Sequence, residues 1–572
     1  MPPSMIEESA RLTAAEAVLV VLRPSDPADP ALLDRLQDRL GAVYQHVTSA
    51  VKPFARWDAS GTHVVAGLTP HGSAPAGSLT LWGLPVGATG DATAAELAAV
   101  AHDPAAARDL LGVWVLVTEH ADGVRIVSSS DLTHTVVRAS GPDGIAYATR
   151  GIAALRAVGA PLRIAVERIP ELLAFDYVLG DDELLAGTRV LPEASTVDSD
   201  RVGDRIGSYW TAEERFAPGP PTDAARLREV LGADAARLAQ VSGAHVGLTA
   251  GRDSTLLMSC LRERGIVLPT FTIGFPDLPD AVGARAVAAE CGTTHGLLCP
   301  ADSAPALQRA VAWSAWTEGM DVAWNLVGAP LEWDGPRPIV WLGGSGGETG
   351  RAFYWHGRRD GTSHLDILAE AAARPWWDPT ARETLRSRIS TAALGDPALA
   401  GRDGWSTLDL VYARGRMRKW LLRSTPRPEA RGLLSGYTSP AVVRALLDIP
   451  EHARRTGAIF DQALAMDAVD LHRLAQDASR PSGPGHRSRR LPARVVPASV
   501  RRALRARRPL PLPGALAAVI EQLPADRVTA QVMGPTWWPE TLRGATRDPE
   551  AGHLLWLAIA VEALAGWLQE AG

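Results

Sequence analysis

The stretch His245-Val-Gly-Leu-Thr-Ala-Gly-Arg-Asp-Ser254 decides the fold of the C-terminal half of the chain. Its first five residues predict a short strand, and the apolar spacing after Ser254 predicts a helix that ends at Arg264. The small residues between them predict a tight strand-to-helix turn. Backbone N–H groups in such a turn approach an anion closely, and the helix N-terminus adds a partial positive charge. The stretch therefore predicts a phosphate-binding loop.

Three residues of this loop have separate expected roles. Gly251 permits a backbone conformation that a Cβ atom would forbid. Ser254 offers a hydroxyl group to a phosphate oxygen, and Asp253 offers a carboxylate to Mg²⁺ bound to the same phosphates. A second interpretation stays open on these residues alone, because Asp and Ser are also favoured at an ordinary capped helix start.

The segments around the loop alternate between helix and strand. Helices are expected at 223–240 and 281–291, and strands at 270–275 and 296–299. This alternation is typical of a doubly wound α/β domain, in which helices cover both faces of a parallel sheet. We therefore expect the ligand site at the carboxyl ends of the strands.

The rest of this half is predicted to be mostly helical from about residue 365. The interval 480–513 is rich in Pro, Gly and Arg and is expected to form a loop or a solvated basic helix. Residues 553–568 are apolar but short for a membrane span and include Glu562. They predict a buried C-terminal helix.

Residues 1–210 show a different pattern. Short β-branched and aliphatic runs, such as 17–22 and 111–118, alternate with turn clusters and predict a predominantly β domain. A Pro- and Gly-rich segment then predicts a linker at 211–222. We expect two domains, at 1–210 and 223–572.

The composition excludes some classes of protein. It is 46% hydrophobic and 21% charged with a net charge of −6, which indicates a soluble globular protein without a bias toward nucleic acid. The three cysteines, Cys260, Cys291 and Cys299, are too few for a disulfide framework and indicate a reducing cytoplasm. We predict no membrane partner.

The loop lacks the GxxxxGK[ST] spacing of a Walker motif. It resembles instead the SGGxDS pyrophosphate loop of the asparagine synthetase and N-type ATP pyrophosphatase superfamily, with Thr249-Ala250 in place of Ser-Gly. Three later segments extend the resemblance: Phe271–Phe275, the helix and strand entry Ala284–His295, and Val340–Gly350, which is similar to the family's LSGEGSDE turn.

This resemblance implies ATP and Mg²⁺ as cofactors. It implies metal ligation by Asp253 and Glu348, adenine next to Ile273, and a close approach of Gly343 and Gly344 to the nucleotide. The residues that it places on the pyrophosphate are Leu248, Thr249, Ala250, Gly251, Arg252, Asp253 and Ser254.

The first domain resembles the glutamine amidotransferase domain of the same family. The landmarks are Leu111–Trp114, Ser130–Leu132, Ala146–Arg150 and Gly187–Pro192. Pro2 stands where members with glutaminase activity expose a cysteine, so an inactive β-sandwich with a structural or peptide-binding role is expected.

A relative without the glutaminase nucleophile is expected to use an amine already present on its substrate. Ser345 stands where β-lactam synthetases carry a tyrosine, which argues against that group. The segments Gly346–Arg351, Tyr412–Trp420 and Tyr437–Pro440 are most similar to lasso peptide cyclases. Such an enzyme adenylates an Asp or Glu side chain of a core peptide, and the peptide's N-terminal amine then closes a macrolactam.

The resemblance also implies partners and leaves one catalytic group open. A precursor core peptide would be the substrate, beside a leader peptidase and a leader-recognition protein. The family's catalytic lysine is missing, and Arg487 is our candidate for its replacement, with Lys419 as a weaker one. The remaining alternatives are an asparagine synthetase-like or β-lactam synthetase-like amide ligase and an inactive peptide-binding scaffold.

Overall fold

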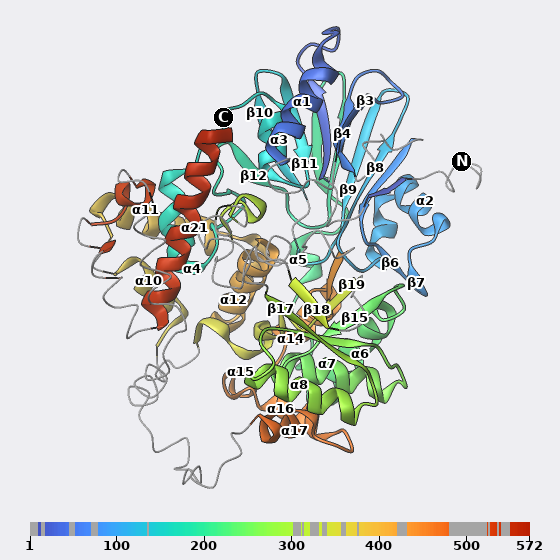
Figure 1. Cartoon of the computed structure of the whole chain (residues 1–572), viewed down its shortest axis with the longest axis vertical. Coiled ribbons are helices and arrows are strands. Elements are labelled where there is room, and N and C mark those ends of the chain that lie inside the picture. Colours follow the sequence, from blue (N-terminus) through green and yellow to red (C-terminus); the bar gives the residue numbers. More distant parts are fainter. Residues whose placement is uncertain are drawn as a thin grey trace.

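The computed structural model of the chain places the N-terminal half above the parallel sheet of the C-terminal half, with further C-terminal helices beside them (Figure 1). The residues that it describes are 10–12, 18–44, 52–69, 78–133, 136–300, 311, 314–320, 331–334, 340–355, 362–374, 377–419, 432–479, 523, 527–534, 537–538, 541 and 549–571.

Two six-stranded sheets form the N-terminal half. One has the order β1-β5-β8-β9-β13-β14 and the other the order β12-β10-β11-β2-β4-β3. Their longer strands are β2 (Val18–Pro24), β3 (Lys52–Trp57), β4 (Val64–Thr69), β5 (Leu79–Gly83), β8 (Trp114–Glu119), β9 (Gly123–Ser128), β10 (Val137–Gly141), β11 (Gly144–Ala148), β13 (Ser195–Asp200) and β14 (Asp204–Ser208), with β1 (Ala10–Leu12) and β12 (Thr188–Val190) at the edges. A separate pair consists of β6 (Val86–Gly87) and β7 (Gly90–Asp91).

The sequence of β2 explains how side chains pack on both faces of its sheet. Successive strand residues point to opposite faces. Leu19 and Val21 therefore join the core between the two sheets, whereas Val18, Val20 and Leu22 join a core under α1 (Leu32–Tyr44) and α3 (Gly151–Ala157). The other sheet is covered by α2 (Ala94–His102) and η2 (Pro104–Asp109). The expected β domain is thus a sandwich with helices on its two outer faces.

A third six-stranded sheet organises the C-terminal half, in the order β18-β17-β16-β15-β19-β20. All neighbours are parallel except β17 and β18. The chain starts at β15 and continues outward on both sides of it, so β15 and β19 flank the switch point. The strands are β15 (Ala244–Gly247), β16 (Thr270–Ile273), β17 (His295–Pro300), β18 (Leu331–Asp334), β19 (Val340–Gly343) and β20 (Gly432–Ser435).

The two faces of this sheet differ. Alternate residues such as Val246, Leu342 and Leu434 belong to one large apolar cluster, to which several helices contribute. The opposite face carries a small cluster that includes Phe271 and Trp341. We expected helices on both faces, but in the described part of the chain these helices share one face. They are α6 (Ala224–Leu238), α7 (Arg252–Glu263), α8 (Pro279–Glu290), α14 (Pro440–Leu447), α16 (Ala458–Ala465) and α17 (Leu471–Ala478).

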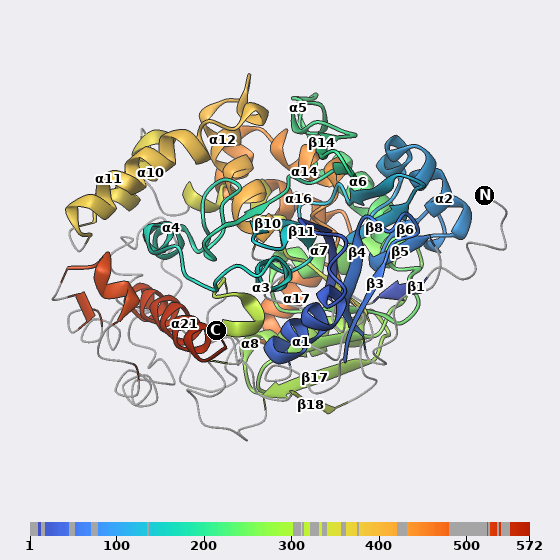
Figure 2. The same ribbon diagram turned by 90° about the horizontal axis from the view of Figure 1, so that it is seen from above.

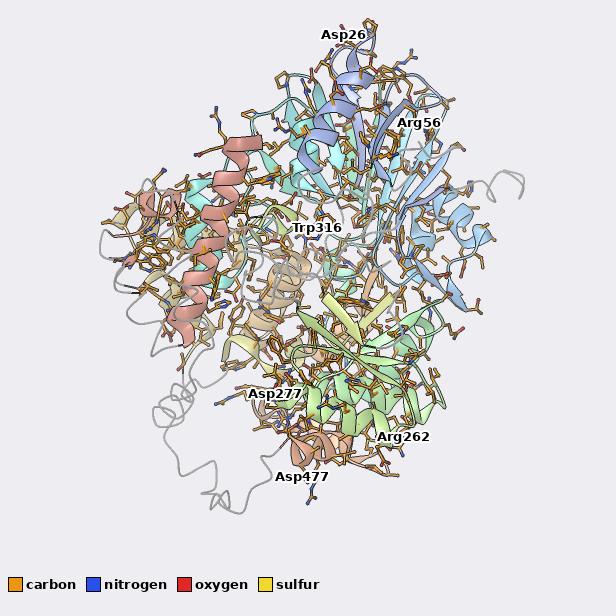
Figure 3. All side chains as sticks on the ribbon, in the orientation of Figure 1. Asp26, Arg56, Arg262, Asp277, Trp316 and Asp477 are labelled. Carbon is orange, nitrogen blue, oxygen red and sulfur yellow. The ribbon has the colours of Figure 1, made fainter. Side chains whose placement is uncertain are left out.

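The two halves are joined by buried contacts. Trp316 lies between them (Figure 3), where its ring faces the Arg150 guanidinium at 4.7 Å and its carbonyl accepts a hydrogen bond of 3.2 Å from Arg150. The segment 211–222 contains the short helix α5 (Ala212–Arg215), and Arg215 and Phe216 are each 1% exposed. The start of this segment is therefore packed into the structure, whereas residues 217–221, its Pro- and Gly-rich part, are exposed.

The remaining helices form a group beside the sandwich, as the view from above shows (Figure 2). The C-terminal helix α21 packs against α4 and buries Leu555, Ile559 and Leu564, as expected of a buried helix. No helix in the described ranges has the length and apolar character to cross a membrane. This group contains α4 (Ile169–Phe175), α10 (His364–Ala372), α11 (Pro379–Arg388), α12 (Gly404–Val411), α21 (Pro549–Ala571), the 3₁₀ helices η3 (Val166–Arg168), η5 (Phe353–Trp355), η7 (Pro397–Leu399) and η9 (Val528–Gln531), and the π-helical segments η6 (Ile389–Ala393) and η8 (Tyr412–Met417). Two further elements lie with the helices of the parallel sheet: η4 (Gly347–Arg351) follows β19, and α15 (Glu451–Thr456) contacts α16.

Candidate functional site

The loops that follow β15 and β19 meet at the switch point of the parallel sheet. Ligands of open α/β sheets bind at this place, outside the carboxyl ends of the strands. A cavity of about 330 Å³ lies here, which we call the switch-point pocket. Nine residues predicted from the sequence line it: Leu248, Thr249, Gly251, Asp253, Ser254, Ile273, Gly343, Gly344 and Glu348.

The start of α7 offers backbone donors to this pocket. Gly251 is the N-cap residue, and no side chain caps the helix. The alternative of an ordinary capped start is thus not supported, since Asp253 lies inside the first turn. The amide of Thr249 donates to Ser254 Oγ at 3.1 Å, and that of Ala250 donates to Asp280 Oδ1 at 3.2 Å. The donors that remain for an anion are therefore the first-turn amides of α7.

The Ser254 side chain takes part in the hydrogen bonding of the loop itself. Its side chain is buried, and its hydroxyl lies 3.0 Å from Thr249 Oγ1 as well as accepting from the Thr249 amide. The Thr249 hydroxyl also accepts a hydrogen bond of 3.1 Å from the Gly251 amide. These side chains hold the turn closed, so Ser254 shapes the loop.

The glycines that the pocket requires differ from the one singled out in the sequence. Gly251 has φ −76°, which any residue adopts, so the expectation of a special conformation is wrong. A Cβ atom on Gly344 would lie 2.8 Å from the Ser254 amide nitrogen, and one on Gly347 would lie 2.5 Å from Asp253 Oδ1. These two glycines let the loop after β19 approach α7 closely.

Asp253 is the most perturbed acid of the pocket. Its side chain is 15% exposed, and Oδ2 accepts a hydrogen bond of 2.5 Å from Arg351 Nη2. Its Oδ1 atom is buried without a hydrogen-bond partner among the described residues. Burial raises the pKa of Asp253 well above its usual range; Arg351 opposes this effect, and the negative charge of Glu348 adds to it.

Glu348 supplies the second carboxylate of the pocket. It lies in η4, and its Oε2 accepts a hydrogen bond of 3.1 Å from the Gly346 amide. No cluster of three or more His, Cys, Asp or Glu side chains that could hold a metal is found within the described ranges. Two carboxylates nevertheless suit Mg²⁺ that is shared with phosphates, and the unpartnered Asp253 Oδ1 is a ligand atom of the right kind.

An apolar wall lines the other side of the pocket. Ile273 is 39% exposed at the end of β16, next to Phe271 and Trp341, whose ring centroids are 5.0 Å apart. The ring of Trp341 was not expected from the sequence, although its place in a strand directly before Gly343 was a usable signal. These side chains offer an apolar surface of the kind that lines pockets for small-molecule ligands such as a purine base.

Three predicted residues lie outside the pocket lining, and a fourth is not described. Ala250 does not line the pocket, and the Arg252 guanidinium pairs with Asp461 at 2.9 Å. Arg487 falls outside the described residues. Lys419 is fully buried, and its Nζ donates a hydrogen bond of 2.7 Å to the Val178 carbonyl oxygen. Lys419 therefore joins the two halves and is not part of the pocket.

In comparisons with known protein families, one segment of the chain matches a family model. The family model described as asparagine synthase matches residues 226–325. This match supports the asparagine synthetase-like superfamily and an ATP-dependent, amide-bond-forming ligase of that kind. The matched range contains the 248–254 loop and Ile273 but ends before Glu348. No curated protein matches the sequence.

Two solved structures are similar over part of the chain. One is described as the allosteric regulatory enzyme of purine biosynthesis and is 12% identical, with a TM-score of 0.23. The other is glutamine phosphoribosylpyrophosphate (PRPP) amidotransferase from B. subtilis complexed with ADP and GMP, which is 11% identical with a TM-score of 0.22. Each match covers 59% of this chain and 77% of the other. Such low TM-scores support no inference about this chain.

Proposed function

We propose that this protein is a lasso peptide cyclase, an ATP-dependent macrolactam synthetase. The side-chain carboxylate of an Asp or Glu in a core peptide attacks the α-phosphate of ATP, which releases pyrophosphate and gives an acyl-adenylate. The N-terminal amine of the same peptide then attacks the acyl carbon. An amide bond forms, AMP leaves, and the amine loses one proton.

The observation that carries the proposal is the pairing of Asp253 and Glu348 in one pocket at the N-terminus of α7. The two carboxylates would hold Mg²⁺, which neutralises charge on the phosphates when bound. The first-turn amides of α7 would donate hydrogen bonds to the leaving pyrophosphate. The apolar wall with Ile273 would receive adenine. An inactive scaffold would not require this combination.

Other residues support the proposal that the attacking amine belongs to the peptide substrate. Residues 1–259 contain no cysteine, so the N-terminal sandwich has no thiol nucleophile for glutamine hydrolysis. Ser345, which lines the pocket, lacks the acidic phenol expected at this position of a β-lactam synthetase. Both observations favour an amine that is part of the substrate, held beside the acyl-adenylate by proximity alone.

The proposal includes partners and a location. The substrate would be a precursor core peptide that a leader peptidase has released with the help of a leader-recognition protein. The reaction would take place in the cytoplasm, where ATP and Mg²⁺ are available.

Mass spectrometry tests the proposal directly. Synthetic peptides with a free N-terminal amine and one Asp or Glu at successive positions are incubated with the enzyme, ATP and Mg²⁺. We expect loss of one water from a peptide together with release of AMP and pyrophosphate, and none of these products with the Asp253→Asn variant. Release of AMP with aspartate and ammonia, but with no peptide, would favour the asparagine synthetase-like alternative. Peptide binding without any AMP would favour the scaffold.

A further inference from the structure

Arg351 occupies the carboxylate that is expected to hold a metal ion. It is the last residue of η4, and its Nη2 atom lies 2.5 Å from Asp253 Oδ2. Its side chain is 26% exposed, so one side of the guanidinium faces solvent. The sequence places these residues 98 positions apart. Only the close approach of the loop after β19 to α7 brings them together.

Few other groups fix the position of this guanidinium. It lies 5.5 Å from the ring centroid of Phe460, and its Nε atom has no hydrogen-bond partner in the described part of the chain. A cation over an aromatic ring is attracted without a strict direction, because the ring quadrupole acts over its whole face. The guanidinium can therefore leave Asp253 and still keep its contact with Phe460.

The negative charge of the pocket favours a nearby guanidinium. Asp253 and Glu348 line the pocket, whereas its lining includes no Lys or Arg among the described residues. ATP would add further negative charge, which one Mg²⁺ ion neutralises only in part. A metal ion on Asp253 Oδ1 would compete with Arg351, which pairs with Oδ2, for the negative charge of the same carboxylate. A released guanidinium presents paired N–H donors that match a phosphate group.

We propose that Arg351 is a phosphate-binding residue that pairs with Asp253 until ATP and Mg²⁺ bind. When Mg²⁺ takes its place on Asp253, Arg351 moves to the pyrophosphate end of ATP and stabilises the leaving group. This inference rests on the proposed binding of ATP and Mg²⁺ but not on the identity of the substrate. It also supplies the positive charge that neither Lys419, which is buried elsewhere, nor Arg252, which pairs with Asp461, brings to the pocket.

Two binding measurements on Arg351→Gln should change in opposite directions. Binding of Mn²⁺ without nucleotide, measured by electron paramagnetic resonance at pH 8.5, should become about fivefold tighter because a competing cation is removed. Binding of pyrophosphate in saturating Mg²⁺, measured by calorimetry, should become tenfold to a hundredfold weaker because a charge-assisted contact is lost. Arg351→Lys should restore pyrophosphate affinity only in part, since an ammonium group lacks the paired donors.

Arg262→Gln is the matched control. Arg262 lies on the same helix as Asp253, but it pairs with Glu290 at 3.3 Å and lies on the outer part of this half (Figure 3). Neither affinity should change by more than about twofold. Far-UV circular dichroism of each variant establishes that the protein is folded.

Three outcomes would contradict the proposal that Arg351 moves from Asp253 to the pyrophosphate. They are weaker binding of both probes, unchanged pyrophosphate affinity, and unchanged Mn²⁺ affinity in folded Arg351→Gln. The first outcome would indicate a structural role. If the opposite changes occur but no peptide is cyclised by the wild-type enzyme, the inference about Arg351 stands and the proposed function fails.

Discussion

Two cavities of this molecule contain buried charges, and they use them differently. The switch-point pocket has two carboxylates, and one arginine approaches it from outside its lining. A second cavity of about 390 Å³ lies between the two halves, next to η6 and η8. Arginines and aspartates line this interdomain cavity together, and they pair with one another. Charged residues alone therefore do not identify a ligand site.

Glu193 and Asp253 show the difference for single acids, although Glu193 itself does not line the interdomain cavity but pairs with Arg414 and Arg418, which do. Burial alone would raise the pKa of Glu193, but the guanidiniums of Arg414, Arg215 and Arg418 hold this pKa well below its usual range. Their nitrogen atoms lie 2.9, 3.2 and 3.6 Å from the carboxylate. Asp253 has a single arginine, and its pKa is raised. The cations around Glu193 outweigh its burial, whereas the arginine beside Asp253 does not.

Asp253→Asn should have the largest effect on activity and little effect on stability. The amide cannot ligate Mg²⁺ as a carboxylate does, so release of pyrophosphate should fall about a thousandfold, or about 4 kcal/mol. The midpoint of thermal unfolding should stay close to that of the wild type, because the desolvation cost of the buried carboxylate is removed while the partly exposed Arg351 guanidinium stays hydrated. A pyrophosphate-release assay and calorimetric melting check this. Activity above one tenth of wild type would show that the pocket is not the reaction site.

Glu193→Gln should give the reverse pattern. It leaves three buried guanidiniums without their shared carboxylate, so the free energy of unfolding should fall by about 3 kcal/mol. Pyrophosphate affinity of the folded variant should not change. Urea titration and calorimetry measure the two quantities. Glu214→Gln, at an exposed pair with Arg108, is the control and should cost less than about 0.5 kcal/mol. An unchanged stability of Glu193→Gln would remove the distinction between the cavities.

Gly344→Ala should weaken pyrophosphate binding about tenfold. The new methyl group would lie 2.8 Å from the Ser254 amide nitrogen, and the backbone of α7 or of the loop after β19 must move. Gly251→Ala should change the affinity less than about threefold, since its φ is ordinary and its nearest contact is the Thr249 hydroxyl at 3.0 Å. Calorimetry compares the two variants. An equal loss in both would favour the conformational role first expected for Gly251.

The pH dependence of stability should show the smallest difference, about 1 kcal/mol, and it has opposite signs for the two acids. The lowered pKa of Glu193 gives stability that is complete above the unfolded pKa and is lost as the pH falls through the folded pKa. The raised pKa of Asp253 gives stability that is complete at low pH and is lost as the pH rises toward the folded value. In EDTA, the free energy of unfolding of Asp253→Asn should therefore increase relative to that of the wild type as the pH rises from 4 to 9. The penalty of Glu193→Gln should shrink in acid. Urea titrations from pH 4 to 9 test the Asp253 slope, and titrations continued below pH 4 test the Glu193 slope.

The sequence by itself determined the local features of the site. The strand predicted at 245–249 is observed as β15 (Ala244–Gly247), and the helix after it is observed as α7 (Arg252–Glu263). Apolar periodicity and turn residues act between neighbours in the chain, so a short window contains the information. Nine of the predicted pocket residues could be named because strand ends of a parallel sheet meet at one edge.

The groups that compensate the buried charges can be identified only from the folded chain. The pairing of Asp253 with Arg351, the burial of Lys419 between the halves and the need for Gly344 in place of Gly251 all depend on residues far apart in the chain. A motif shows that a carboxylate is present, but its pKa and its availability to a metal depend on the distant cations that folding brings near it. The sequence therefore predicts that Asp253 is a metal ligand, but only the fold shows that a metal ion would have to displace Arg351 from it.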